Sequence, residues 1–208
     1  MIKSNDSISS LGATVKKMTD KEFWDWFLTK KTEIEKFILS DTDEYSVYNE
    51  LTDKLKSYHE LVMPELTQDP EGINILILTC DGKQDGIEPV ERLFEKAPTI
   101  DKWRIQKFRA PGHVNELNYQ GLSIKADEIR VKSNFDGDYY NIELFIRGYK
   151  ESDIRYKALA FLYLDHFLGE YNVMTKIGQI EFKKLGLFSG TADKTGLHEL
   201  RTIIERLN

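Results

Sequence analysis

Cysteine is almost missing from this chain, because Cys80 is the only one among its 208 residues. A lone cysteine excludes an intramolecular disulfide and a zinc site built from several cysteines of this chain. Such sparing use of cysteine fits a reducing compartment, so we expect a cytoplasmic location.

Basic charge and long apolar runs are also scarce. Asp and Glu outnumber Lys and Arg by 35 to 29, which leaves a net charge of −6. A phosphate backbone needs a basic surface, so we expect no nucleic-acid partner. The first residues lack the apolar segment of a signal peptide, and no run of about 18 apolar residues occurs. We therefore expect a soluble protein with no membrane partner.

Glycine-rich and nucleophile motifs are missing as well. The sequence contains neither a Walker pattern nor G-x-G-x-x-G, and it contains no G-x-S-x-G elbow. The motifs therefore assign no reaction, and we predict no cofactor and no metal site.

The clearest pattern that is present runs from Tyr139 to Phe182. An alternating segment at 141–147 predicts a strand with one buried face, and Gly148 ends it. Residues 154–168 are apolar on nearly every side, which is typical of a helix buried from several directions. Gly169 is suited to close that helix, and we expect a second strand over 173–182.

The remaining elements follow from periodicity and from turn residues. Thr19 and Glu22 match a capping box, which predicts a helix to about Leu39. A second amphipathic helix is expected over about 44–62. Asp136-Gly137 predicts a hairpin between two strands. Further expected elements are strands at 73–79 and 103–108, a helix at 87–96 and a terminal helix at 198–207.

These elements predict an α+β fold, because the strands cluster with hairpins and do not alternate strictly with helices. We expect one mostly antiparallel sheet with helices on one face, in a ferredoxin-like core order. The expected organisation is a flexible tail at 1–18 and a single domain at 19–208. That domain divides into a helical hairpin (19–63) and the sheet with its helices (64–208).

Three polar residues in predicted loops are candidates for ligand binding, namely Asp81, Arg109 and His113. Asp81 follows the strand at 73–79, and His113 lies in a Pro-Gly loop that begins with Arg109. An arginine and a histidine in one loop can bind an anion or move a proton. A solvated loop histidine is the competing interpretation.

Cys80 and His166 have structural interpretations beside functional ones. A nucleophilic thiol needs a base and a lowered pKa, and nothing in the sequence brings a histidine to Cys80. We therefore interpret Cys80 as a small buried residue at a strand end. His166 and Glu170 are four residues apart, but Gly169 ends the helix between them, so surface polarity is the preferred interpretation.

Aromatic residues crowd the first predicted helix. Four large rings occupy five positions from Phe23 to Phe27, so they cannot all face one buried stripe. Trp24 or Trp26 is therefore a candidate for partner binding, since exposed tryptophans are enriched at interfaces. The competing interpretation is that both pack inside the protein.

Aromatic, proline and glycine residues also form a spaced pattern: Phe23-Trp24-Asp25-Trp26-Phe27, Asp81-Gly82, Ala97-Pro98, Trp103, Phe108-Arg109-Ala110-Pro111, Leu168-Gly169-Glu170-Tyr171 and Ile177-Gly178. This pattern resembles a family of uncharacterised bacterial proteins over about residues 20–182. The resemblance implies a bacterial, cytoplasmic protein. The family has no assigned activity, so it supplies no catalytic residues.

Two functions from different classes are compatible with the sequence. The leading hypothesis is a non-enzymatic protein-binding module with a protein partner, for example an acidic protein that caps a basic one. The alternative is a small-ligand-binding protein or hydrolase-like enzyme that uses the loops of Asp81, Arg109 and His113. The alternative requires those loops to converge in one pocket.

Overall fold

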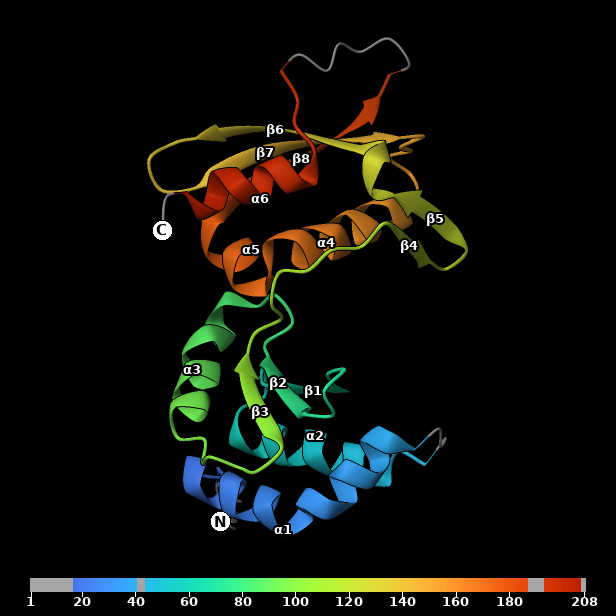
Figure 1. The fold of residues 1–208 in the computed structure, drawn as a ribbon. Coiled ribbons are helices and arrows are strands. Elements are labelled where there is room, and N and C mark those ends of the chain that lie inside the picture. The colour runs from blue at the N-terminus through green and yellow to red at the C-terminus, as the bar shows by residue number, and fades with distance from the viewer. Residues whose placement is uncertain (1–16, 41–43, 187–192, 207–208) are drawn as a thin grey trace, which may run out of the picture.

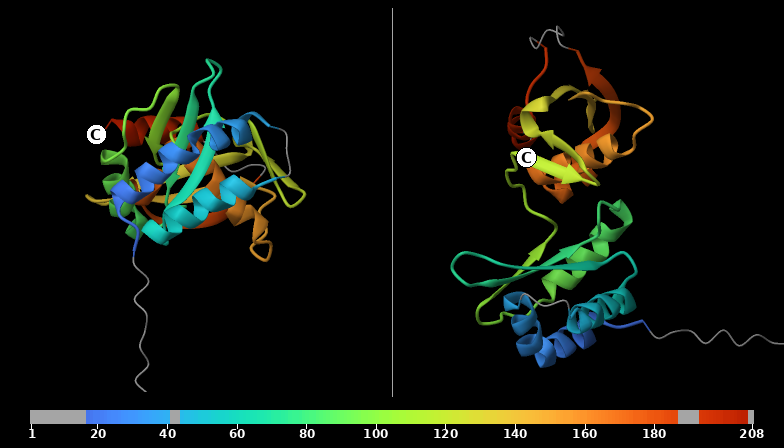
Figure 2. Two further views of the ribbon diagram at one scale, coloured as in Figure 1. Left: turned by 90° about the horizontal axis from the view of Figure 1, so that it is seen from below. Right: turned by 90° about the vertical axis from the view of Figure 1, so that its right-hand side faces the viewer.

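A computed structural model describes residues 17–40, 44–186 and 193–206. The expected tail at 1–18 lies outside the described residues except for its last two positions. The described chain forms two lobes with separate hydrophobic cores, and a segment after residue 108 connects them (Figure 1). The right-hand view of Figure 2 shows the same arrangement from the side. We call residues 17–108 the N-lobe and residues 109–206 the C-lobe.

The N-lobe begins with the two expected helices, α1 (Asp20–Leu39) and α2 (Ser46–Tyr58). The predicted capping box starts α1, because Thr19 and Glu22 each accept a hydrogen bond from the backbone N–H of the other. Phe23, Phe27 and Ile34 are fully buried along one face of α1. The two helices contact each other below the N-lobe sheet (Figure 1).

The N-lobe sheet has the order β1-β2-β3, with β1 (Met63–Gln68) antiparallel to β2 (Asn74–Thr79) and β3 (Trp103–Lys107) parallel to β2. The 3-10 turn η1 (Gln84–Gly86) and helix α3 (Ile87–Glu95) connect β2 to β3. Side chains alternate between the two faces of a strand. Leu76 and Leu78 face the helices and are fully buried, whereas Ile77 and its cross-strand partner Glu65 face away from them.

The C-lobe opens with a hairpin of β4 (Glu116–Tyr119) and β5 (Leu122–Lys125), followed by the 3-10 turn η2 (Ala126–Glu128). Its main sheet has the order β6-β7-β8, from β6 (Ile129–Phe135), β7 (Tyr140–Arg147) and β8 (Ile177–Leu185). Helices α4 (Arg155–Leu168) and α6 (Leu197–Glu205) cover one face of this sheet (Figure 1). The short helix α5 (Glu170–Lys176) follows α4 directly.

The two lobes repeat one ββαβ unit. In each unit the first strand pair is antiparallel, and the second pair is parallel across a helical connection. The turn inside the antiparallel pair is built alike, because Asp69 and Asp136 each accept two backbone N–H bonds on one carboxylate oxygen. An Asn-Ile pair stands near the start of the central strand in both lobes, at Asn74 and at Asn141.

The α+β class is confirmed, but the described strands form three small sheets and not the single expected sheet in ferredoxin-like order. Local patterns mark strands without showing which strands pair, and the segment after β3 carries the chain to a second core. The strand expected at 173–182 begins only at Ile177, because residues 170–176 form α5. The division into one domain at 19–208 stays a prediction.

No helix within the described parts of the chain has the length and apolar content needed to cross a membrane.

Candidate functional site

Arg109 lies where the two lobes meet and binds three carboxylates from three different elements. Its Nε donates to Glu65 of β1 at 2.6 Å, and its Nη2 donates to Asp81 after β2 at 2.8 Å. Its Nη1 donates to Asp165 of α4 at 3.0 Å, which joins the N-lobe carboxylates to the C-lobe. The planar guanidinium presents its donors in a fixed fork, so it suits several carboxylates at once.

The charges around Arg109 do not balance. One guanidinium faces three carboxylates, which leaves a net charge of −2 in this cluster. Burial alone lowers the pKa of Arg109, but its hydrogen bonds to Glu65 and Asp81 outweigh burial and raise that pKa above its ordinary value. Arg109 is therefore charged at neutral pH.

Asp165 is the most enclosed of the three carboxylates, with 22% of its side chain exposed. Burial raises its pKa, Arg109 opposes that shift, and the nearby charges of Glu170 and Asp81 reinforce it. Asp81 in contrast is 68% exposed, so it faces solvent at the rim of the cluster. The cluster thus runs from a buried end on α4 to an open end on the N-lobe.

Glu170 at the start of α5 is fully buried and connects the lobes beneath this cluster. Its carboxylate accepts bonds from the Thr79 hydroxyl at 2.7 Å and from the backbone N–H groups of Cys80, Gly82 and Arg109 at 3.1 Å each. Three donors of the N-lobe and the backbone N–H of Arg109, the first residue of the C-lobe, therefore surround this one carboxylate. A buried carboxylate is tolerated only with such a set of donors.

Three backbone segments around Glu170 contain residues with positive φ. Asp81 and Phe108 have φ values of +53° and +59°, a region that side chains with a Cβ occupy sparingly. Gly169, at φ +79°, passes so close to Pro111 that an added Cβ would lie 2.8 Å from its ring. Strained backbone of this kind concentrates at functional sites and at switch regions.

Cys80 lies inside this junction and not at its surface. Its side chain is fully buried, and its sulfur is 3.5 Å from the Met174 sulfur of α5. Burial, with the charge of Glu170 beside it, raises the pKa of the Cys80 thiol to about 12. The thiol is therefore protonated at neutral pH, which agrees with the interpretation of Cys80 as a small buried residue at a strand end.

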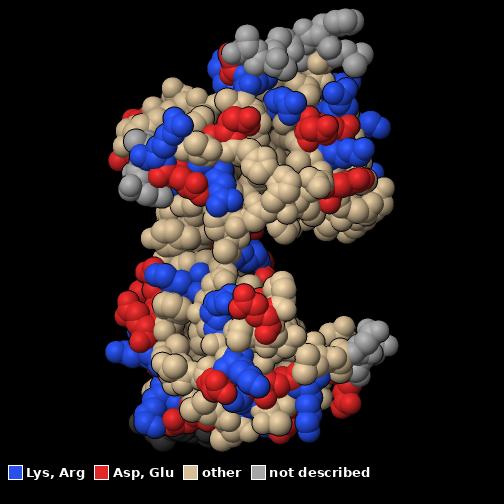
Figure 3. All heavy atoms as spheres, viewed as in Figure 1, with Lys and Arg blue, Asp and Glu red and all other residues tan. Residues whose placement is uncertain are grey.

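Two neighbouring open cavities of about 570 and 530 Å³ lie where the lobes meet. Both are lined by Asp81, Asp165 and Leu162. The first also includes the outward face of the N-lobe sheet, with Glu65 and Ile77. We call the two cavities together the interlobe cleft. The space-filling view shows the molecule hollowed between the lobes (Figure 3).

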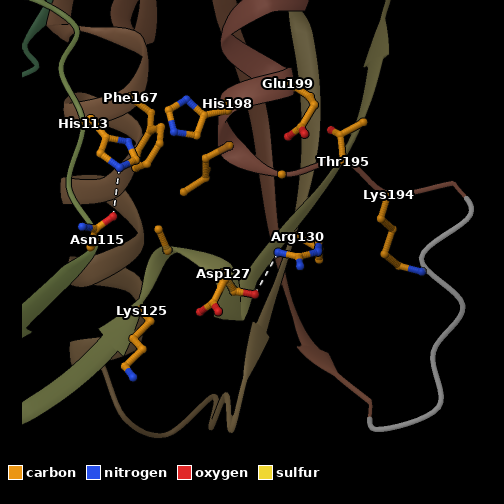
Figure 4. Close-up of a pocket in the computed structure, with 13 residues that line it drawn as sticks. His113, Asn115, Lys125, Asp127, Arg130, Phe167, Lys194, Thr195, His198 and Glu199 are labelled. Atoms are coloured by element: carbon orange, nitrogen blue, oxygen red, sulfur yellow. Dashed lines mark hydrogen bonds between the residues drawn. The ribbon is translucent and has the colours of Figure 1, made fainter.

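The structure brings two of the three predicted ligand residues together. Asp81 and Arg109 form an ion pair in the interlobe cleft, but His113 lines a different cavity in the C-lobe, beside His198 (Figure 4). His166, interpreted from sequence as surface polarity, is exposed at the edge of the cleft.

The two tryptophan candidates differ in exposure. Trp24 is only 4% exposed and donates its indole N–H to the Leu93 carbonyl. Trp26 is half-buried, and its indole N–H donates to Glu50 of α2. Only Trp26 therefore retains ring surface for a partner on this helix.

Glu65 belongs to the site although the sequence did not single it out. Glu170 was interpreted from the sequence as surface polarity beside His166, and that interpretation is wrong, because Glu170 is fully buried against the N-lobe. Glu65 comes from β1, a short strand with no motif. Glu170 and Asp165 had one available signal, since both are carboxylates next to a nearly continuous apolar segment. A carboxylate in such a position needs a partner, which is Arg109 for Asp165 and a set of N-lobe donors, including Thr79, for Glu170.

Within the described part of the chain, no group of three or more His, Cys, Asp or Glu side chains could hold a metal ion. A comparison with protein-family models found no match, and a comparison with curated proteins found none. No residue role therefore transfers to this chain from another protein.

Proposed function

We propose that this protein is a non-enzymatic protein-binding module and that its binding surface is the interlobe cleft. The observation that carries the proposal is the uneven charge at Arg109, where three carboxylates surround one cation in an open cleft. A positively charged side chain of a partner would neutralise the remaining charge. Complementary charge of this kind favours association with basic partners.

Apolar surface beside the charges supports a protein partner over a small ion. Phe161 and Leu162 of α4 are 46% and 39% exposed, and both line the interlobe cleft. Ile77 lies on the opposite wall, on the open face of the N-lobe sheet. Binding surfaces combine apolar contact area with a few polar groups that set orientation. We therefore propose a basic segment with apolar neighbours as the occupant.

The alternative, a small-ligand-binding protein or hydrolase-like enzyme, has weaker support. Asp81 and Arg109 are in contact, but His113 lines another cavity. The only thiol, Cys80, is buried with a raised pKa. Neither arrangement offers a nucleophile beside a base in the cleft.

A charge-matched capture experiment tests the proposal. The cleft variant combines Glu65→Gln with Asp81→Asn. The control combines Glu71→Gln with Asp85→Asn, which removes the same charge from exposed positions that do not line the cleft. We expect a stoichiometric partner from source-cell lysate to bind wild type and control and to be lost from the cleft variant. A partner retained by the cleft variant, or lost equally from both variants, contradicts the proposal.

A photoreactive amino acid separates the cleft from the first helix. At Leu162 in the cleft it is expected to cross-link the partner, and at Leu28 on α1, which is 46% exposed, it is not. Trp26→Ala provides the complementary test, because it removes the half-buried ring of α1 and leaves the cleft intact. Loss of the partner through Trp26→Ala alone would place the binding surface on α1.

A further inference from the structure

The C-lobe contains a separate cavity, of about 650 Å³, that shares no lining residue with the interlobe cleft. It lies between the segment that leads into β4, the end of β5 with η2, and the start of α6. Its principal polar and aromatic lining residues are His113, Lys125, Asp127, Arg130, Lys194 and His198 (Figure 4). A volume of this size accommodates a small organic molecule.

Two histidines form a stacked platform on one side of this cavity. The rings of His113 and His198 lie 4.6 Å apart at an interplanar angle of 23°. Phe167, which is only 1% exposed, meets both rings edge-on at 5.6 and 4.8 Å and supports them from the core. The His113 ring is further fixed by a 2.9 Å hydrogen bond to Asn115. Such a platform suits a planar ring, because aromatic rings pack in offset stacks.

The charge of this cavity is opposite to that of the interlobe cleft. Lys125, Arg130 and Lys194 line it together with two carboxylates, Asp127 and Glu199, which leaves one net positive charge among the lining residues; Lys194 also pairs with Asp193, at 3.3 Å. Such a charge stands out in a chain whose total is −6. The cavity is therefore suited to a ligand that carries negative charge.

The Arg130 guanidinium is fixed in position by the backbone at the edge of this cavity. Its Nη1 donates to the backbone carbonyls of Asp127 at 2.8 Å and Ile129 at 2.9 Å, which fixes the guanidinium. Its Nε and Nη2 donors have no hydrogen-bond partner among the described residues. In Figure 4 Arg130 and Asp127 lie across the cavity from the histidine pair. A pre-oriented guanidinium binds phosphate through two parallel bonds.

We propose that this cavity binds a small ligand in which a planar heteroaromatic ring is joined to a phosphate, as in a mononucleotide. The ring stacks on the platform of His113 and His198, and the phosphate meets Arg130. The proposal concerns different residues from the interlobe cleft and is independent of the function proposed for it.

Calorimetric titration of the full chain with adenosine monophosphate, adenosine and inorganic phosphate tests this site. We expect the nucleotide to bind at least about tenfold more tightly than either fragment, because only it uses both halves of the cavity. Arg130→Gln is expected to weaken the nucleotide about tenfold or more without changing adenosine binding. His198→Ala is expected to weaken both, because the platform loses one of its two rings.

Two matched variants serve as controls. Arg201→Gln removes the same charge from α6, where Arg201 pairs with Glu205 and does not line the cavity. His59→Ala removes an imidazole from the N-lobe. Both are expected to bind the nucleotide as wild type does. The proposal is overturned if the nucleotide does not bind, if it binds no better than phosphate, or if Arg130→Gln and Arg201→Gln weaken it equally.

Discussion

Replacing Glu170 by glutamine tests whether this buried carboxylate joins the two lobes. Its two oxygens accept bonds from one hydroxyl and three backbone N–H groups. An amide has the same shape but one acceptor oxygen. In glutamine the NH₂ group would face the Arg109 N–H if the oxygen kept the donors at Cys80 and Gly82. At least one buried donor then loses its acceptor.

The expected cost follows from the bonds that change. A buried donor without a partner costs about 1–3 kcal/mol, and hydrogen bonds to a charged acceptor are about 1 kcal/mol stronger than neutral ones. Relief from burying a charge offsets part of this loss. We expect Glu170→Gln to lower the free energy of unfolding by about 3 kcal/mol, a large share of the roughly 5–15 kcal/mol typical of proteins.

Urea denaturation measures this loss with two probes. Trp24, Trp26 and Trp103 are the only tryptophans and all belong to the N-lobe core, so their fluorescence reports that lobe. Far-ultraviolet circular dichroism reports both lobes. Thr79→Val replaces the hydroxyl by a methyl group of similar size, and a double-mutant cycle with Glu170→Gln measures the coupling of the pair.

The control is Glu181→Gln on β8, where the carboxylate is 64% exposed. We expect a change below about 0.5 kcal/mol there. A loss at Glu170 no larger than that of the control would refute the reasoning, as would a cycle with no coupling to Thr79. Separate unfolding transitions of fluorescence and circular dichroism in Glu170→Gln would show directly that the lobes had lost their connection.

Three further predictions concern the N-lobe. Trp24→Ala should cost about 3–5 kcal/mol of stability because a buried ring is removed, whereas half-buried Trp26→Ala should cost clearly less; equal losses in urea denaturation would contradict this. Cys80 should react with Ellman's reagent only on unfolding, so rapid reaction of the native protein would contradict its burial. The folded pKa values of Cys80 and Tyr58 are raised to about 12 from 9.0 and 10.0, so the unfolded chain loses these protons first. Stability should therefore fall as pH rises from about 9 to about 12, with a smaller fall in Cys80→Ala, and an unchanged denaturation midpoint would refute it.

Local chemistry made much of the secondary structure predictable. The capping box at Thr19, the apolar run of β2 and the Asp136-Gly137 turn each act over a few residues, and each produced the expected element. The helix α5 was not predicted, because Gly169 indicated the end of a helix and no side-chain capping signal marks the start of another at residues 170–176. Its helix is held by tertiary contacts, through Glu170 and Met174 at the N-lobe.

The candidate site was predictable only in part. Asp81 and Arg109 were identifiable as polar residues at element ends, where binding residues concentrate. His113 comes from the same loop as Arg109, yet it lines another cavity. Between these two residues the loop runs along α4, where the Gly112 N–H donates to the His166 carbonyl. Sequence distance within a loop did not decide which cavity each side chain enters.

The sequence by itself determined most helices and strands and the turns between them, because those depend on periodicity and on residues a few positions apart. Only the tertiary structure decided that the strands divide into two ββαβ lobes and where the charges meet. Arg109 pairs with Glu65, which is 44 residues away in sequence, and with Asp165, which is 56 residues away. Glu170 bonds to Thr79, which is 91 residues away. Contacts at such separations arise from packing two cores together, and no local pattern encodes them.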